Sequence, residues 1–233
     1  GTNPGDVFLL DDAFFVKPTL LFPFFTPAEK YGINEFNNTP VVTYQNGTAH
    51  FYLPAYPKAG SVYLSGSFNN WSTMQNPMHR TEKGWETSLK LAPGEYQYKF
   101  IVDGKWITDP GNKKKVPDGH AGFNSVFYCY NYIFKLQGFT EAKTVILSGS
   151  FNNWNKKKLR MQRSITGWQL PVYLPEGTYA YKFIVDGQWI NDPANSNLRA
   201  DASGNLNSFM GIGDTLIFRL KGYTNATKVV LAG

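Results

Sequence analysis

A lysine and a tryptophan, Lys99 and Trp106, are the residues whose types and spacing point most clearly to binding chemistry. An indole offers a broad apolar face, and an ammonium group offers three hydrogen-bond donors. On an exposed surface such a pair forms a platform for a ligand. The pair recurs as Lys182 and Trp189. An Asn-Asn-Trp sequence precedes each pair, at 69–71 and at 152–154.

A predicted hairpin places this pair on one face of a sheet. Asp103–Gly104 is a strong signal for a two-residue turn, so Val102 should pair with Lys105 and Ile101 with Trp106. Because side chains alternate along a strand, the residues around the turn divide into two faces. The face away from the core is expected to hold Gln97, Lys99, Ile101 and Trp106, and the core face Tyr96, Tyr98, Phe100 and Val102.

A purely structural role for the pair is an open alternative. Trp106 would then cover the end of a domain or pack against a neighbouring one, and Lys99 would keep an outer face soluble. The second copy does not decide between the two, because duplication also copies structural residues.

The pair belongs to a stretch of about 65 residues that is present twice without insertion or deletion. Ser61–Trp71 returns as Thr144–Trp154, and Tyr96–Trp106 returns as Tyr179–Trp189. A period of about 83 residues matches one small domain rather than a solenoid repeat. The expected organisation is an N-terminal segment (1–45), module one (46–130), module two (131–214) and the start of a truncated third module (215–233).

Each module is predicted to be a small all-β sandwich, because short alternating stretches are separated by turn residues without helical periodicity. The expected strands are His50–Leu53, Ser61–Leu64, Gly84–Leu91, Tyr96–Val102 and Asn124–Tyr130 in module one, and Ile133–Leu136 and Thr144–Leu147 at the start of module two. Residues 216–223 and 228–233 resemble the first two strands of a further module. Two strands without a sheet to join are unstable alone. We therefore expect the natural protein to continue into a third module.

Residues 1–45 match nothing in the repeat and are rich in aromatic side chains. That much apolar surface must be covered, by module one, by a preceding domain or by a protein partner. The sequence does not choose among these. The aromatic residues are Phe8, Phe14, Phe15, Phe22, Phe24, Phe25, Tyr31 and Phe36.

Composition excludes several classes of protein. No run of apolar residues is long enough to span a membrane, and the single Cys129 is expected to be an inert buried thiol. The net charge of +6 includes the runs Lys113–Lys115 and Lys156–Lys158. Each run lies among turn residues, so we interpret both as solvated loops and expect no nucleic-acid partner.

The acidic and histidine residues do not suggest catalysis, a metal or any cofactor. Asp-Gly and Asp-Pro dipeptides are explained by turns, whereas a glycosidase needs two carboxylates flanking a cleft. No histidine has an equivalent in the other module, so no shared acid–base or metal site is expected. The residues concerned are Asp103, Asp109, Asp186, Asp192, His50, His79 and His120.

These motifs resemble family 48 carbohydrate-binding modules, the type found as the glycogen-binding domain of the AMP-activated protein kinase beta subunit. The resemblance rests on Gly66–Trp71, Tyr96–Phe100, Asp103–Trp106, Asp109–Pro110 and Asn124, and it covers both modules. It implies an immunoglobulin-like sandwich in each module. It also implies a glucan site formed by Trp71, Lys99, Trp106 and Asn124, and by Trp154, Lys182, Trp189 and Asn207.

Such a site suits a sugar, since indoles stack on pyranose faces while lysine and asparagine bond to hydroxyl groups. The chain departs from the glycogen-binding members at one place. Those members carry a leucine in the loop before the final strand, whereas 118–123 and 201–206 have none in that position. A glycan other than a helical glucan therefore stays open.

The sequence thus favours a non-catalytic array that binds a polysaccharide, with an α-glucan of the glycogen or starch type first. The alternative is a set of structural or docking domains that bind a protein partner through residues 1–45. An attached enzyme outside this chain is compatible with both. Tandem modules with one cysteine favour a bacterial cell-surface or secreted protein, although no residue establishes the compartment.

Overall fold

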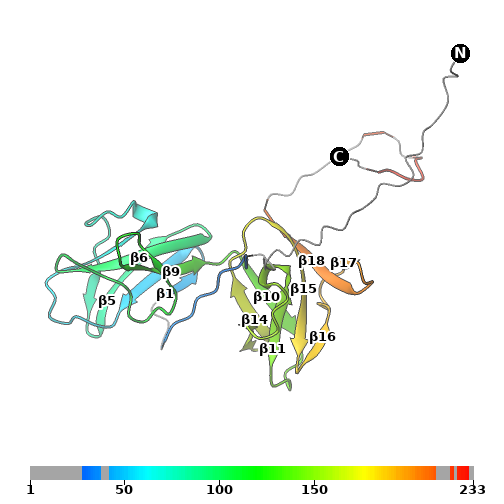
Figure 1. Ribbon diagram of the computed structural model, residues 1–233, viewed down its shortest axis with the longest axis horizontal. Coiled ribbons are helices and arrows are strands. Elements are labelled where there is room, and N and C mark those ends of the chain that lie inside the picture. Colours follow the sequence, from blue (N-terminus) through cyan, green and yellow to red (C-terminus); the bar gives the residue numbers. More distant parts are fainter. Residues whose placement is uncertain (1–27, 38–41, 214–220, 223–224, 231–233) are drawn as a thin grey trace, which may run out of the picture.

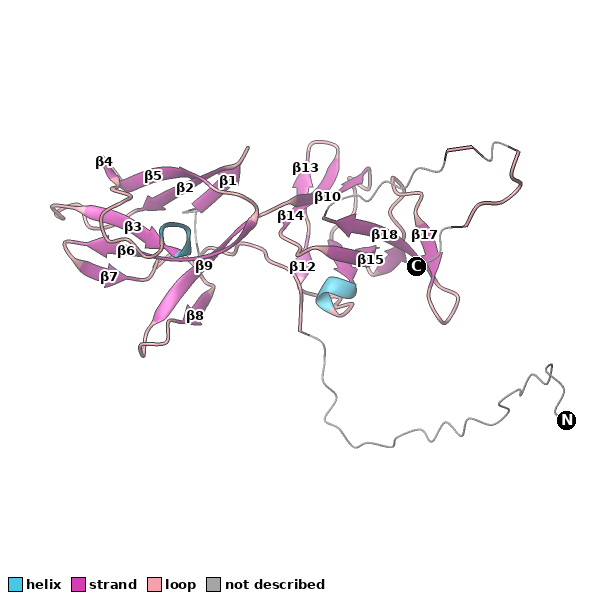
Figure 2. Ribbon diagram, turned by 90° about the horizontal axis from the view of Figure 1, so that it is seen from above, coloured by secondary structure: helices cyan, strands magenta, loops and turns pink. Residues whose placement is uncertain are grey.

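The computed structural model describes residues 28–37, 42–213, 221–222 and 225–230. Within them the chain forms two β-sandwiches placed end to end along the longest axis of the molecule (Figures 1 and 2). Apart from two short 3-10 turns, the regular structure of this part consists of strands. None of its helices has the length and apolar character needed to cross a bilayer. The predicted all-β class is confirmed.

Module one consists of a four-stranded sheet in the order β1-β2-β5-β4 and a five-stranded sheet, in which β3-β6-β9-β8 follow one another and β7, the fifth strand, pairs with β6. All of these pairs are antiparallel. The elements are β1 (Val42–Gln45), β2 (Thr48–Leu53), β3 (Val62–Gly66), η1 (Ser67–Asn69), β4 (His79–Thr81), β5 (Gly84–Lys90), β6 (Gly94–Val102), β7 (Lys105–Ile107), β8 (Lys115–Pro117) and β9 (Phe123–Cys129).

Module two repeats this plan. One sheet has the order β10-β14-β13, and the other has the order β12-β11-β15-β18-β17 with β16 paired to β15. The elements are β10 (Tyr132–Gln137), β11 (Val145–Gly149), η2 (Ser150–Asn152), β12 (Leu159–Arg160), β13 (Gln162–Ser164), β14 (Gly167–Val172), β15 (Gly177–Val185), β16 (Gln188–Ile190), β17 (Leu198–Ala200) and β18 (Leu206–Ile212).

The two faces of β6 divide as the alternation predicts. Tyr98 and Phe100 are fully buried between the sheets, Val102 is buried beside them, and Tyr96 packs at the edge of the same core. Ile101 lies on the opposite face and is nevertheless buried, since strands pair with it on both sides. This division leaves the outer face of the sheet for the functional side chains.

The end of the predicted N-terminal segment belongs to a sheet. Val42–Gln45 forms β1, which pairs with β2 along its whole length. The pairing extends module one by a strand on the N-terminal side of residue 46.

The described residues 28–37, here called the connecting segment, contact both modules of their own chain. Gly32 exchanges two backbone hydrogen bonds with Tyr173 of module two, at 2.8 and 2.9 Å. The amide of Asn34 donates to the carbonyl of Tyr128 in module one and accepts from its N–H, both at 2.8 Å. The segment therefore ties the two modules together.

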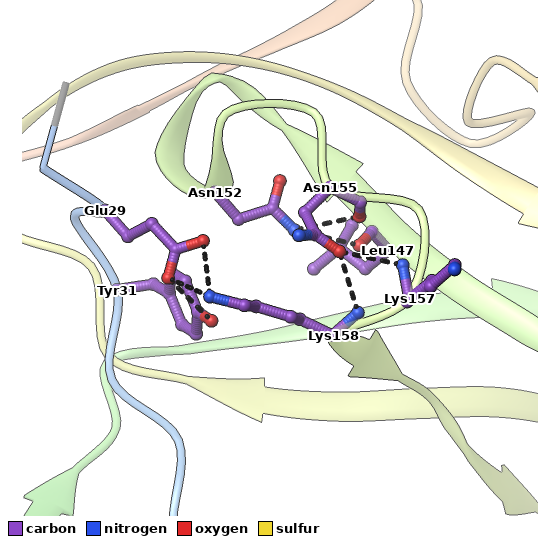
Figure 3. Close-up of polar contacts among 7 residues, drawn as sticks. All are labelled: Glu29, Tyr31, Leu147, Asn152, Asn155, Lys157 and Lys158. Atoms are coloured by element: carbon purple, nitrogen blue, oxygen red, sulfur yellow. Dashed lines mark hydrogen bonds and ion pairs between the residues drawn. The ribbon is translucent and has the colours of Figure 1, made fainter. Parts of the chain in front are cut away.

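Side chains reinforce this tie. Tyr31 packs against the core of module two, and Phe36 packs against the core of module one. Lys158 makes an ion pair with Glu29 at 2.9 Å (Figure 3). The other six phenylalanines of the N-terminal segment lie outside the described residues.

The expected start of a third module falls mostly outside the described residues, which include 221–222 and 225–230 of it. Residues 228–230, predicted to open a strand, are in no strand.

Candidate functional site

Trp71 is presented by a strained turn that follows β3. Asn70 and Trp71 have φ angles of 52° and 58°, in the left-handed region that costs energy for residues other than glycine. The Asn69 side chain braces the turn by accepting from the N–H of Gly66 at 3.0 Å and donating to the carbonyl of Leu64 at 3.2 Å. The Asn-Asn-Trp motif therefore fixes the direction in which the indole of Trp71 points.

Module two builds the same turn. Asn153 and Trp154 have φ angles of 52° and 56°, and Asn152 accepts from Gly149 at 3.0 Å. A β-carbon on Gly149 would lie 2.5 Å from the carbonyl oxygen of Ala180, so only glycine fits beside the next strand. The contact at Gly66 in module one is equally close, at 2.4 Å.

The second indole of each module is placed by the predicted hairpin. Asp103 and Gly104 have φ angles of 45° and 79°, and Trp106 stands opposite Ile101 as expected. The Asp103 carboxylate also accepts the N–H groups of Gly60 and Ser61, each at 2.9 Å. It thereby ties the hairpin to the start of β3, a role that a turn motif alone does not reveal.

Trp71 and Trp106 come together on the outer face of module one. Their ring centres are 6.3 Å apart and their planes meet at 51°, so they form an angled pair. Trp106 is 46% exposed. Both border an open hollow of about 610 Å³, which is lined by Trp71, Gln97, Lys99, Trp106, Pro117, Asp118, His120 and Asn124. The structure thus brings together all four residues expected for this module.

Lys99 reaches this hollow in an ion pair. Its Nζ lies 2.6 Å from the Asp118 carboxylate, and both side chains are little exposed. Asp118 also accepts the backbone N–H groups of His120 at 2.8 Å and Gly122 at 2.9 Å. The hydrogen bond from Lys99, followed by that from His120, holds the pKa of Asp118 well below its usual range. Asp118 therefore stays ionised and orients the lysine, which keeps further donors for a ligand.

Asn124 is only 6% exposed although it lines the hollow. Its amide donates to Oε1 of Gln97 at 2.9 Å. This bond orients the asparagine, so Gln97 acts as its support on the neighbouring strand β6.

The two equivalent indoles of module two also come together. Trp154 and Trp189 lie 6.1 Å apart at 55°, with Trp189 37% exposed. Asn207 is again 6% exposed. Its support differs, because Ala180 stands where module one has Gln97, and its amide donates to the carbonyl of Asn205 at 3.5 Å.

Lys182 also differs from its counterpart Lys99. Within the described ranges it has no ion pair, while Asp201 accepts the N–H groups of Ser203 and Asn205 in its own loop, each at 2.9 Å, as Asp118 does in module one. Lys156 lies over the Trp189 ring, with Nζ 5.7 Å from the ring centre. The two platforms share their indoles but not their charges.

The carboxylates of Asp109 and Asp192 are structural. Asp109 accepts the hydroxyl of Tyr98 at 2.6 Å, and its N–H donates to Ser125, while burial raises its pKa. Asp192 holds the equivalent bond with Tyr181 at 2.7 Å. Neither carboxylate lines the hollow of module one, where the acidic lining residue is Asp118. The paired carboxylates of a glycosidase are therefore not found at this hollow.

Among the described residues, no group of three or more His, Cys, Asp or Glu side chains could hold a metal ion. His50 on β2 instead contacts Ser88 at 2.9 Å and Glu86 at 3.7 Å on the neighbouring strand β5. Cys129 is buried, and burial raises the pKa of its thiol to about 12.

Four lining residues were not among the expected site residues: Gln97, Pro117, Asp118 and His120. The signal for Asp118 was present, since an aspartate that opens a glycine-rich loop commonly bonds to backbone N–H groups within it. Its bond to Lys99 joins the β8–β9 loop to β6 and has no local signal.

Comparison with known proteins finds one family in both modules. A profile of the family described as "Glycogen recognition site of AMP-activated protein kinase" matches residues 56–127 and 131–217, about two thirds of the chain. The beta-1 subunit of 5'-AMP-activated protein kinase from Homo sapiens is 55% identical over 49 residues, which are 21% of this chain and 17% of that protein. The same subunit from Sus scrofa matches equally over 38% of its length.

A plant protein is equally similar. Protein PTST homolog 2, chloroplastic, from Arabidopsis thaliana is 55% identical over 53 residues, 22% of this chain and 10% of that protein. The matched part thus covers less than two fifths of the length of each of these relatives. The profile matches both modules, and each matched module is an all-β sandwich with two converging indoles. The chain therefore belongs to the family of the glycogen recognition site of AMP-activated protein kinase, a family of carbohydrate-binding modules.

Proposed function

We propose that this chain binds an α-1,4-glucan of the glycogen or starch type, without catalysis, through one platform in each module. The observation that carries the proposal is the pair of indoles set at 51° beside the hollow of module one, repeated at 55° in module two. Stacking on both indoles at such an angle requires a chain that bends between successive sugars. An α-1,4-glucan curves in this way, whereas a β-1,4-linked chain is extended and flat.

The polar residues complete the proposed recognition. Lys99 supplies donors for hydroxyl groups and is oriented by Asp118. Asn124, oriented by Gln97, supplies an amide at the floor of the hollow. In module two, Lys182 and Asn207 take the same parts. Shallow platforms of this kind bind with dissociation constants on the order of micromolar to millimolar. A glucan long enough to reach both modules gains avidity.

The alternative of a protein-docking array has less support. Its motive was the aromatic segment 1–45, and the described residues 28–37 and 42–45 pack on the chain's own modules. The proposal therefore stays with a polysaccharide ligand.

Affinity electrophoresis tests the proposal. The chain is run through gels that contain glycogen, soluble starch or xylan, and through a gel without polysaccharide. We expect retardation by glycogen and starch that is lost in the Trp106→Ala/Trp189→Ala variant. Retardation by xylan alone would replace the α-glucan with a flat chain, and unchanged mobility in all gels would refute polysaccharide binding.

A further inference from the structure

The two platforms differ in charge at equivalent positions. Lys156 of module two stands where module one has Thr73, and Arg199 stands where module one has Val116. Module two therefore carries two cations that module one lacks at these positions. The acidic loop residue does not change, because Asp201 is the counterpart of Asp118.

Lys156 lies at the platform, and Arg199 lies on the face of the sheet that holds Asn207. The Nζ of Lys156 is 5.7 Å from the centre of the Trp189 ring. Arg199 is directly opposite Asn207 in the β17–β18 register, so the two side chains share a face of the sheet. The guanidinium of Arg199 lies 4.9 Å from the ring centre of Phe209 on that face.

The central lysines differ in the same direction. Lys99 makes an ion pair with Asp118 at 2.6 Å. Lys182 has no such partner in the described part of the chain, although Asp201 bonds to backbone N–H groups of its own loop as Asp118 does, and those bonds lower the pKa of Asp201. No lysine of the basic run Lys113–Lys115 lines the hollow of module one, and Lys114 turns to the hydroxyl and ring of Tyr128.

We infer that the second platform takes a glucan chain bearing an anionic substituent, a phosphate monoester, while the first takes the unsubstituted chain. This inference rests on the proposed function. A pyranose stacked on Trp189 moves the flexible Lys156 to the rim of the sugar, where a substituent lies. A phosphate ester carries nearly two negative charges at neutral pH and pairs well with lysine and with the fork of an arginine. Lys182 supplies a third cation across the platform.

The experiment uses the full chain with module one silenced by Trp71→Ala/Trp106→Ala. The ligands are a phosphorylated dextrin from starch and the same dextrin after phosphatase treatment, each titrated calorimetrically. At about 50 mM salt we expect the phosphorylated dextrin to bind roughly 3- to 10-fold more tightly, and at about 500 mM salt we expect that ratio to approach one.

Variants that restore the residues of module one provide the matched control. Lys156→Thr/Arg199→Val is expected to remove the phosphate preference. The reciprocal Thr73→Lys/Val116→Arg, made with module two silenced by Trp154→Ala/Trp189→Ala, is expected to create it. Equal affinity for the two dextrins at low salt would overturn the inference and leave the proposed function standing. Failure of both dextrins to bind either silenced chain would overturn the proposed function itself.

Discussion

The exposed and buried tryptophans of this chain should respond in opposite ways to truncation. Trp106 is 46% exposed, and about 200 Å² of indole surface therefore leaves roughly 90 Å² for a ligand. If one sugar face covers half of that area, burial contributes about 1 kcal/mol and stacking adds roughly 0.5–1 kcal/mol. Trp106→Ala should then weaken glucan binding at module one by roughly 10- to 30-fold.

The matched control is Trp85, which is 5% exposed in the core of the same module and donates to the carbonyl of Tyr56. Trp85→Ala opens a cavity and should cost about 3–5 kcal/mol of folding free energy. Trp106→Ala leaves a space that water fills, so it should cost only about 1–2 kcal/mol.

Calorimetric titration with a malto-oligosaccharide and thermal unfolding would be measured for both variants, with module two silenced by Trp154→Ala/Trp189→Ala. The reasoning fails if Trp106→Ala lowers the melting temperature as far as Trp85→Ala does. It also fails if Trp106→Ala keeps its full affinity.

Three further predictions concern the supports of the platform. Gly66→Ala places a β-carbon 2.4 Å from a backbone oxygen and should cost about 1–3 kcal/mol in thermal unfolding, whereas Gly211→Ala, with open space around it, should be nearly neutral; equal effects would contradict this. The backbone N–H groups of Thr144 and Lys143 lower the pKa of Asp186 below its usual 3.8, so its stabilisation is present above that pH and is lost as the pH falls. In the Asp186→Asn variant the melting temperature should therefore fall less steeply as the pH is lowered through the acid range. An unchanged pH dependence would refute this role of Asp186. Asn34→Ala removes two 2.8 Å hydrogen bonds to Tyr128 and should speed tryptic cleavage after Lys30; an unchanged rate would mean that other contacts hold the connecting segment.

The sequence predicted those parts of the site that depend on local geometry. The Asp103–Gly104 turn determines the pairing of Trp106 with Ile101, and alternation then assigns the faces of β6. These inferences succeed because a two-residue turn leaves only one register.

Long-range contacts were beyond the sequence. Asp118 reaches Lys99 from the loop between two other strands, and no local pattern encodes that meeting. Gly32 bonds to Tyr173, which lies in the other module. β1 at Val42–Gln45 falls in the expected N-terminal segment, because residues 1–45 match nothing in the repeat and only the pairing with β2 joins this strand to module one. The charge difference between the platforms is visible in the aligned copies only once the register places Arg199 opposite Asn207.

The most direct test follows the six tryptophans of the chain at once. Each indole N–H gives its own signal in a ¹⁵N-correlated NMR spectrum, and single substitutions assign them. On titration with maltoheptaose, we predict that the signals of Trp71, Trp106, Trp154 and Trp189 shift. Those of Trp85 and Trp168, whose N–H groups donate to backbone carbonyls in the interior, should stay in place. No shift in the four platform signals, or equal shifts in all six, would contradict a glucan platform at these indoles.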